Sequence, residues 1–181
     1  MRIKFPAILL AGIFFISGAV FGADGVNLYE RFEGKRVKVF MSPIKDSTAN
    51  RKVDPVILKT RLEEALKARK STKFVVVQTA QEAELSIDAD IKDFWWTDHD
   101  PVDMITGLSG AAADAVIVED YARLQVDVKV TEVSKNRIIW QDRVMATVTK
   151  KPMSEAESLP LIMDDFANTF IRQCFGRKKA R

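Results

Sequence analysis

Two segments of the chain alternate strictly between apolar and polar residues, and this alternation constrains the fold more than any other feature. Segment 85–92 reads LSIDADIK, and segment 122–130 reads ARLQVDVKV. Successive side chains of a β-strand point to opposite faces, so each segment predicts a strand with one apolar and one polar face. A sheet built from such strands has one face in a core and the other in water.

Three more strands are expected. Segment 36–41 (RVKVFM) predicts a strand that ends at Ser42-Pro43, and a polar loop follows over 45–52. The run 74–78 (FVVVQ) is apolar without alternation, which predicts a strand that is covered on both faces or placed centrally. The turn Ser134-Lys135-Asn136 predicts a hairpin that joins segment 122–130 to a partner strand from Arg137 to Val148.

Two helices are expected. Asp54-Pro55 supplies an N-cap and a first-turn proline for a helix that runs to about Lys70 with one apolar stripe. Ser154 and Glu157 fit a capping box for a closing amphipathic helix, and Pro160 predicts a start a few residues later. Cys174 continues the apolar stripe of this helix and is expected to be a buried core residue.

The order of these elements is strand, helix, strand, strand, a long connection, strand, strand, helix. It predicts an α+β fold: a two-layer sandwich of a mainly antiparallel sheet with four to five strands and two amphipathic helices on one face. The connection from Phe94 to Asp120 is longer than compact domains usually keep without a use for it.

The first 22 residues have the layout of a secretory signal peptide. Arg2 and Lys4 precede an uncharged apolar run from Ala7 to Val20, which is shorter than a membrane-spanning helix requires. Val20 and Gly22 suit a cleavage that leaves Ala23 first; an uncleaved amino-terminal anchor is the alternative. We therefore expect a signal peptide over 1–22 and one domain over 23–181, with an insertion at about 95–120 and a basic tail over 176–181.

Composition excludes several functions. Loss of Arg2 and Lys4 lowers the net charge from +3 to +1, which gives no support for nucleic-acid binding. Cys174 is the only cysteine, so no internal disulfide forms. The chain has no nucleophile-elbow motif, phosphate-binding glycine loop or Cys/His metal spacing, and His99 lies between two acids that an extended chain would point away from it. We expect no enzyme activity, no cofactor and no metal.

Two groups of residues are candidates for binding. Aromatic and apolar side chains in the predicted insertion are candidate partner contacts: Trp95, Trp96, Met104, Ile105 and Leu108. The alternatives are that the tryptophans cap the core and that 104–118 is a mobile loop. The tail residues Arg177, Lys178, Lys179 and Arg181 are candidate contacts to anionic lipid or lipopolysaccharide, with a solvated terminus as the alternative.

The pattern over roughly 36–148 resembles that of small α+β domains from bacterial envelope proteins. It is carried by segment 37–43, a helix with Leu62 and Leu66, the run 74–77, the step 83–87 (AELSI), the strand 121–130 and Ile139-Trp140. The families it resembles are the lipopolysaccharide-assembly lipoprotein LptE, the curli secretion lipoprotein CsgG and the amino-terminal domain of TolB. Most members carry a lipidated cysteine after the signal peptide, which this chain lacks, and a pair of membrane-spanning strands of the curli-channel kind is also missing.

The resemblance implies an accessory protein that binds another envelope component and has no active site. The leading hypothesis is a non-catalytic periplasmic assembly or transport accessory, peripheral to the outer membrane. It docks on an outer-membrane or secretion complex, or on itself, through the region 94–120. The alternative is a soluble carrier or sensor of a small apolar or lipid ligand held between helices and sheet.

Overall fold

The computed structural model describes residues 28–97, 121–149 and 154–177. The expected signal peptide and most of the expected insertion therefore lie outside the described residues. The helices and strands are α1 (Leu28–Phe32), β1 (Arg36–Met41), β2 (Lys45–Asp46), α2 (Pro55–Ala68), β3 (Lys73–Val77), β4 (Leu85–Trp96), β5 (Ala122–Glu132), β6 (Arg137–Val148) and α4 (Glu155–Phe175). 3₁₀ turns lie at Ala80–Glu82 and Val133–Lys135.

The sheet is mixed and has six strands, so the expectation of a mainly antiparallel sheet with four to five strands was wrong. The order is β3-β1-β4-β5-β6, and β2 also pairs with β4. β1 is parallel to both β3 and β4, β2 is parallel to β4, and the pairs β4–β5 and β5–β6 are antiparallel. β1 and β3 are parallel because the crossover between them contains α2 and returns the chain in the same direction. The short link over 78–84 then passes beside β1 and leads into β4, which also runs parallel to β1.

β3 lies at an edge of the sheet, where the sequence predicted a central or doubly covered strand. It pairs only with β1 among the described strands, and Val75, Val76 and Val77 are half-buried. An apolar run of this length has no alternation to indicate which faces are covered. The error lies in position within the sheet, because the strand itself is present one residue from its predicted start.

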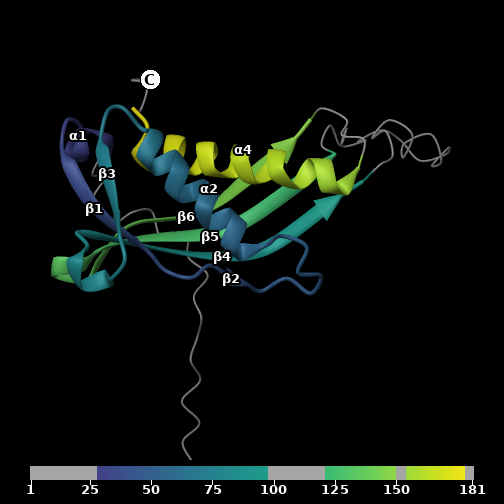
Figure 1. Ribbon diagram of the computed structural model, residues 1–181, viewed down its shortest axis with the longest axis horizontal. Helices are drawn as coiled ribbons and strands as arrows, with labels where there is room; N and C mark the ends of the chain where they lie inside the picture. Colours follow the sequence, from purple (N-terminus) through teal and green to yellow (C-terminus); the bar gives the residue numbers. More distant parts are fainter. Residues whose placement is uncertain (1–27, 98–120, 150–153, 178–181) are drawn as a thin grey trace, which may run out of the picture.

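α2 and α4 lie on one face of the sheet, as predicted (Figure 1). They run in the same direction, because Lys52 pairs with Glu155 near their first turns, Arg61 with Asp164 midway, and Arg69 with the carbonyl of Phe175 at their ends. A third helix, α1, was not predicted. Its Phe32 packs edge-on against Phe175, so α1 closes the end of the core where α4 stops.

The helix starts are set by their N-caps. The carboxylate of Asp54 accepts from the backbone N–H of Val56 at 2.8 Å, and the hydroxyl of Ser154 accepts from that of Glu157 at 3.2 Å. α4 begins at Glu155, so the prediction of a later start at Pro160 was wrong. Pro160 is exposed on the helix surface, where the carbonyl that its ring leaves without a donor can meet water.

The space between the helices and the sheet is filled by side chains. Leu58, Leu62 and Leu66 of α2 and Phe166 and Phe170 of α4 are all 0% exposed. Cys174 is buried with them, as predicted, and burial raises the pKa of its thiol well above the ordinary value. None of the helices in the described ranges has both the length and the apolar character to cross a bilayer.

β6 forms the other edge of the sheet, and two of its backbone N–H groups are occupied by carboxylates. The N–H of Thr147 donates to Asp165 of α4 at 3.3 Å, and that of Arg143 donates to the side chain of Asp142 at 2.8 Å. Both groups point away from β5, because the alternate residues of β6 pair with that strand.

Candidate binding surface on the open sheet face

The sheet face opposite α2 and α4 is covered by no described helix, and we call it the open face (Figure 1). It carries every second side chain of β4 and β5, the polar members of the two alternating segments. In β5 these are half-buried Arg123, Gln125, Asp127 and Lys129. The one-sided strands predicted from the sequence are thus confirmed, and their polar face is the surface available for binding.

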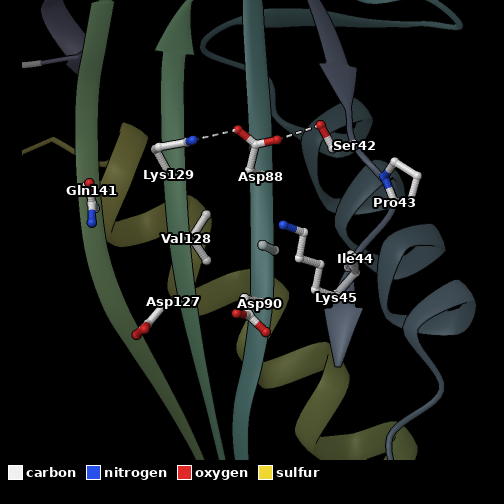
Figure 2. A pocket seen from close by; sticks show the side chains of 11 residues that line it. Ser42, Pro43, Ile44, Lys45, Asp88, Asp90, Asp127, Val128, Lys129 and Gln141 are labelled. Atoms are coloured by element: carbon white, nitrogen blue, oxygen red, sulfur yellow. Dashed lines mark hydrogen bonds and ion pairs between the residues drawn. The ribbon is translucent and has the colours of Figure 1, made fainter. Parts of the chain in front are cut away.

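A groove of about 510 Å³ crosses this face beside the bend between β1 and β2 (Figure 2). One wall is segment 42–45, where Ser42 and Pro43 interrupt what would otherwise be a single strand along β4. The remaining lining comes from β4, β5 and β6: Asp88, Ala89, Asp90, Asp127, Val128, Lys129 and Gln141. The groove is lined by charged side chains of β2, β4 and β5 and by Pro43 and Ile44 of the bend.

Asp88 lies at the centre of this arrangement. Its carboxylate accepts from the Ser42 hydroxyl at 2.6 Å and pairs with the Lys129 ammonium at 3.3 Å, so three strand segments meet at one side chain (Figure 2). Asp88 and Lys129 are direct cross-strand partners, a placement that favours opposite charges.

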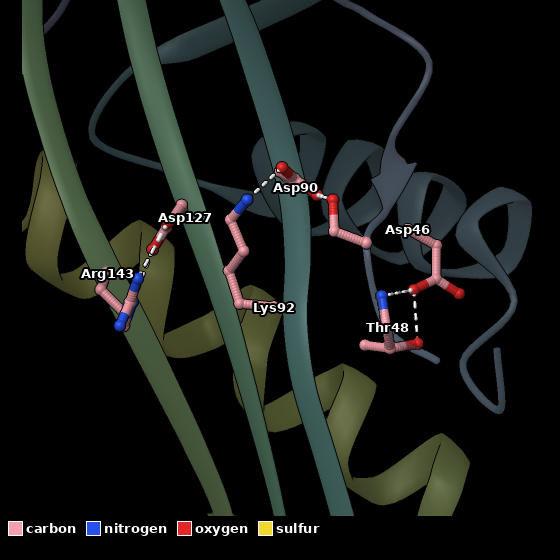
Figure 3. A network of polar contacts seen from close by, with 7 residues as sticks. Asp46, Thr48, Asp90, Lys92, Asp127 and Arg143 are labelled. Atoms are coloured by element: carbon pink, nitrogen blue, oxygen red, sulfur yellow. Dashed lines mark hydrogen bonds and ion pairs between the residues drawn. The ribbon is translucent and has the colours of Figure 1, made fainter. Parts of the chain in front are cut away.

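Asp90 and Asp127 are also direct cross-strand partners, although both carry negative charge. Each is compensated on its other side: Asp127 accepts two hydrogen bonds from Arg143 at 2.6 and 3.1 Å, while Asp90 accepts from Lys92 and from the Ser47 hydroxyl (Figure 3). Burial alone would raise the pKa of Asp90, but the hydrogen bonds from Lys92 and Ser47 outweigh it and lower that pKa. All three carboxylates of the groove therefore have cationic partners.

Trp95 and Trp96 lie in β4 and point to opposite faces of the sheet. A register shift between Ile91 and Asp93 moves Phe94 and Trp96 onto the covered face, where Trp96 packs against the core. Trp95 pairs across the sheet with Arg123, whose guanidinium lies 6.0 Å from the ring centroid, and both are on the open face. Of the two tryptophans, only Trp95 is placed for a partner on that face.

The other candidate residues are divided by the limits of the structure. Arg177 is exposed one residue after the C-cap of α4, whereas Lys178, Lys179 and Arg181 lie outside the described residues. Met104, Ile105, Leu108 and His99 also lie outside them. Within 28–97, 121–149 and 154–177, no group of three or more Asp, Glu, His or Cys side chains is arranged to hold a metal ion.

The groove was missed by the sequence analysis, although its residues were identified as the polar side of their strands. The charged residues were interpreted as solvated side chains. The strand register that pairs Asp88 with Lys129 and Asp90 with Asp127 cannot be read from segment 85–92 or segment 122–130 alone. The only local signal was Ser42-Pro43, which ends β1 and turns the chain along the groove.

Comparisons with known proteins give structural likenesses only. No family model and no curated protein matches the chain. It is similar to the PelC dodecamer from Paraburkholderia phytofirmans, at 14% identity and a TM-score of 0.47 over 74% of this chain and 84% of the other.

Two further likenesses are to proteins described as lipoproteins. One is a putative lipoprotein from Caulobacter crescentus, at 14% identity and a TM-score of 0.38 over 76% of this chain and 94% of that one. The other is lipoprotein GNA1162 from Neisseria meningitidis, at 7% identity and a TM-score of 0.37 over 75% and 99%. At these values the role of the chain has to be argued from its own residues.

Proposed function

We propose that this chain is an exported, non-catalytic accessory protein of the bacterial envelope that binds another envelope protein through its open sheet face. Export is supported by the signal-peptide layout of residues 1–22. The binding role is supported above all by the groove, a concave surface on a face that no described helix covers.

The charges of the groove favour binding over catalysis. A general base or nucleophile must be able to exchange its hydrogen bonds for contacts to a substrate. Here Asp88, Asp90 and Asp127 each accept from a neighbouring cation, which holds their carboxylates in fixed ion pairs. Fixed ion pairs of this kind present a defined pattern of charge to a partner.

The rim of the open face adds apolar contacts. Met145 of β6 lies opposite Gln125 and is 49% exposed, and Ile138 lies opposite Thr131 and is 45% exposed. Both therefore face the same side as the groove, as does Trp95. Apolar and aromatic side chains around a polar centre are a usual composition for a protein interface.

The alternative role, a carrier of an apolar ligand between helices and sheet, finds less support. The side chains that line that space are closely packed, with Leu62, Val126 and Phe166 all 0% exposed. A ligand of appreciable size would have to separate α2 or α4 from the sheet, at the expense of the core.

The proposal is tested by placing a photoreactive amino acid at Met145 or Gln125 on the open face, in cells that make the full chain. Val56 and Leu161, which are 72% and 52% exposed on the helical layer, are the matched control positions. We expect one envelope protein to be crosslinked from the open face and not from the controls. Equal crosslinking from both surfaces, or crosslinking from the helical layer alone, would refute the proposal.

A second measurement asks whether the contact contributes to binding. Met145→Asp introduces a charge on the open face, and Val56→Asp introduces the same charge on the helical layer. We expect Met145→Asp to lower recovery of the crosslinked complex about tenfold or more, as for loss of an interface contact worth over 1 kcal/mol. Unchanged recovery with Met145→Asp would count against a contact at this rim.

A further inference from the structure

The charged residues of this protein are unevenly distributed between its two ends. One end of the domain holds twelve Lys or Arg and five Glu. It consists of segments 28–38, 67–73, 80–84, 132–137 and 172–177. The rest of the described residues contain nine Lys or Arg and thirteen Asp or Glu. A nearly neutral domain thus has one strongly cationic part, which we call the basic end.

Contacts bring these segments together. Arg36 of β1 lies beside Lys73 of β3, and the N–H of Lys73 donates to the carbonyl of Lys35 at 2.9 Å. Arg31 of α1 reaches Glu132 at the end of β5, which also pairs with Lys135 at 3.3 Å. Figure 1 shows α1 and the C-terminal end of α4 at the same end of the molecule.

The fold neutralises only a small part of this charge. Buried Glu132 forms ion pairs with Arg31, Lys135 and Arg137, so one carboxylate is shared by three cations. The parallel helices α2 and α4 both end here, and their two dipoles offer together about one unit of negative charge. Twelve cations exceed the five carboxylates and these dipoles combined, so the ordinary structural roles of helix-terminal lysines and arginines do not account for the excess.

The most exposed cations form a connected surface. Arg36 and Lys73 are exposed neighbours on adjacent strands, Lys35 precedes Arg36, and Lys135 and Arg177 are also exposed. No ion pair to Arg36 or Lys73 is present within the described part of the chain. Arg36 and Lys73 are therefore available to an anionic surface.

We propose that the basic end docks on the anionic phospholipid headgroups of a membrane, an inference that goes beyond the proposed partner binding. A planar array of phosphates complements cations that come from several elements at one end of a domain. The chain continuation after α4 supports this occupant, because Lys178, Lys179 and Arg181 follow Arg177. In this arrangement the domain binds the membrane by one end, the long axis of the sheet points away from the bilayer, and the open face stays accessible.

The test is binding of the protein, purified from its envelope fraction, to vesicles of phosphatidylcholine with and without phosphatidylglycerol. The readout is the increment caused by phosphatidylglycerol, because an uncleaved apolar leader would bind both kinds of vesicle. Each basic residue near an anionic surface contributes about a fivefold factor in partition. We expect Arg36→Glu with Lys73→Glu to lower the increment at least about 25-fold, and salt at about 1 M to abolish it by screening.

The matched control is Arg51→Glu with Lys52→Glu, two exposed adjacent cations at the opposite end of α2 that give the same change in net charge. This pair should leave the increment within about twofold, since it lies outside the basic end by more than a Debye length. Equal losses in both pairs, or no loss in either, would overturn the proposal, with circular dichroism used to confirm that the variants are folded.

Two other results would reassign the basic end. Binding to vesicles that contain lipopolysaccharide, but not to those that contain phosphatidylglycerol, would overturn the phospholipid assignment. Loss of the crosslinked envelope protein from the Arg36→Glu, Lys73→Glu variant, with unchanged vesicle binding, would assign this end to a protein partner. Since the proposed function is measured by crosslinking from Met145 and this inference by vesicle binding, each can fail while the other stands.

Discussion

The covered and open faces of the sheet are built from alternate residues of the same strands, and they differ in what holds them together. In β5, Leu124, Val126 and Val130 on the covered face are 0% exposed and pack beneath α4. The intervening Asp127 and Lys129 on the open face are joined to neighbouring strands by ion pairs. Burial of apolar side chains contributes kilocalories per residue, whereas partly exposed ion pairs contribute fractions of one. Stability is therefore concentrated on one face, and side chains of the other face can change at little cost to the free energy of unfolding.

The largest expected effect comes from the covered face. Phe170 packs against Trp140 and Phe175 at ring-centroid distances of 5.6 and 6.0 Å and is fully buried. Phe170→Ala should lower the free energy of unfolding by about 3–5 kcal/mol, measured by urea denaturation. Met145→Ala on the open face should change it by no more than about 0.5 kcal/mol. Similar losses in the two variants would show that the comparison between the faces is wrong.

An intermediate effect is expected where a carboxylate takes a covered-face position. Glu132 ends β5 with the same orientation as Val130 and is 8% exposed, with Arg31 as its partner. Glu132→Gln should lower the free energy of unfolding at neutral pH by about 1–3 kcal/mol, because charged hydrogen bonds are lost. Glu64→Gln, in an exposed pair with Arg61, is the control and should have little effect.

The same residue gives a pH dependence. Burial by itself would raise the pKa of Glu132, but the hydrogen bonds from Lys135 and Arg31 lower it overall. A carboxylate whose pKa is lower in the folded state stabilises the protein above its unfolded pKa of about 4.3, and this contribution is lost as the pH falls through the folded pKa. The difference between wild type and Glu132→Gln should therefore shrink below about pH 4, and an unchanged difference at acid pH would contradict the role of the ionised group.

The smallest effect is expected from an ion pair of the open face. A double-mutant cycle of Asp127→Ala and Arg143→Ala should give a coupling energy of about 0.2–1 kcal/mol that decreases at high salt. The pair is bidentate but its side chains are 36% and 58% exposed, so solvent screens it. A coupling above about 2 kcal/mol would mean that the open face contributes to stability as the core does.

The sequence was most informative where alternation recorded exposure directly. Segments 85–92 and 122–130 predicted both strands and the side of each that faces water, and the Asp54 cap predicted where α2 begins. These features depend on neighbouring residues alone. The α1 helix was missed because its five residues contain too few turns for a periodic pattern, and its position depends on packing against Phe175.

Pairing of strands could not be predicted in the same way. Nothing within 74–77 distinguishes an edge strand from a central one. The parallel pairing of β1 with β3 follows from the α2 crossover, and that of β1 with β4 from the short link over 78–84. The opposite orientations of Trp95 and Trp96 follow from the shift at Ile91–Asp93, for which the consecutive polar residues Lys92 and Asp93 were the only signal. The groove and the basic end likewise combine segments that are far apart in sequence, so neither can be recognised from one segment alone.

The two carboxylates at the edge of β6 also bear on how copies of this protein can associate. A twelve-residue edge strand offers a ready template for another chain to extend the sheet. Here Asp165 and Asp142 already occupy the outward N–H groups of Thr147 and Arg143, so an incoming strand would have to displace both before its own carbonyls could pair. Addition of a strand at this part of β6 is therefore disfavoured, which reduces the risk of open-ended, amyloid-like growth of the sheet.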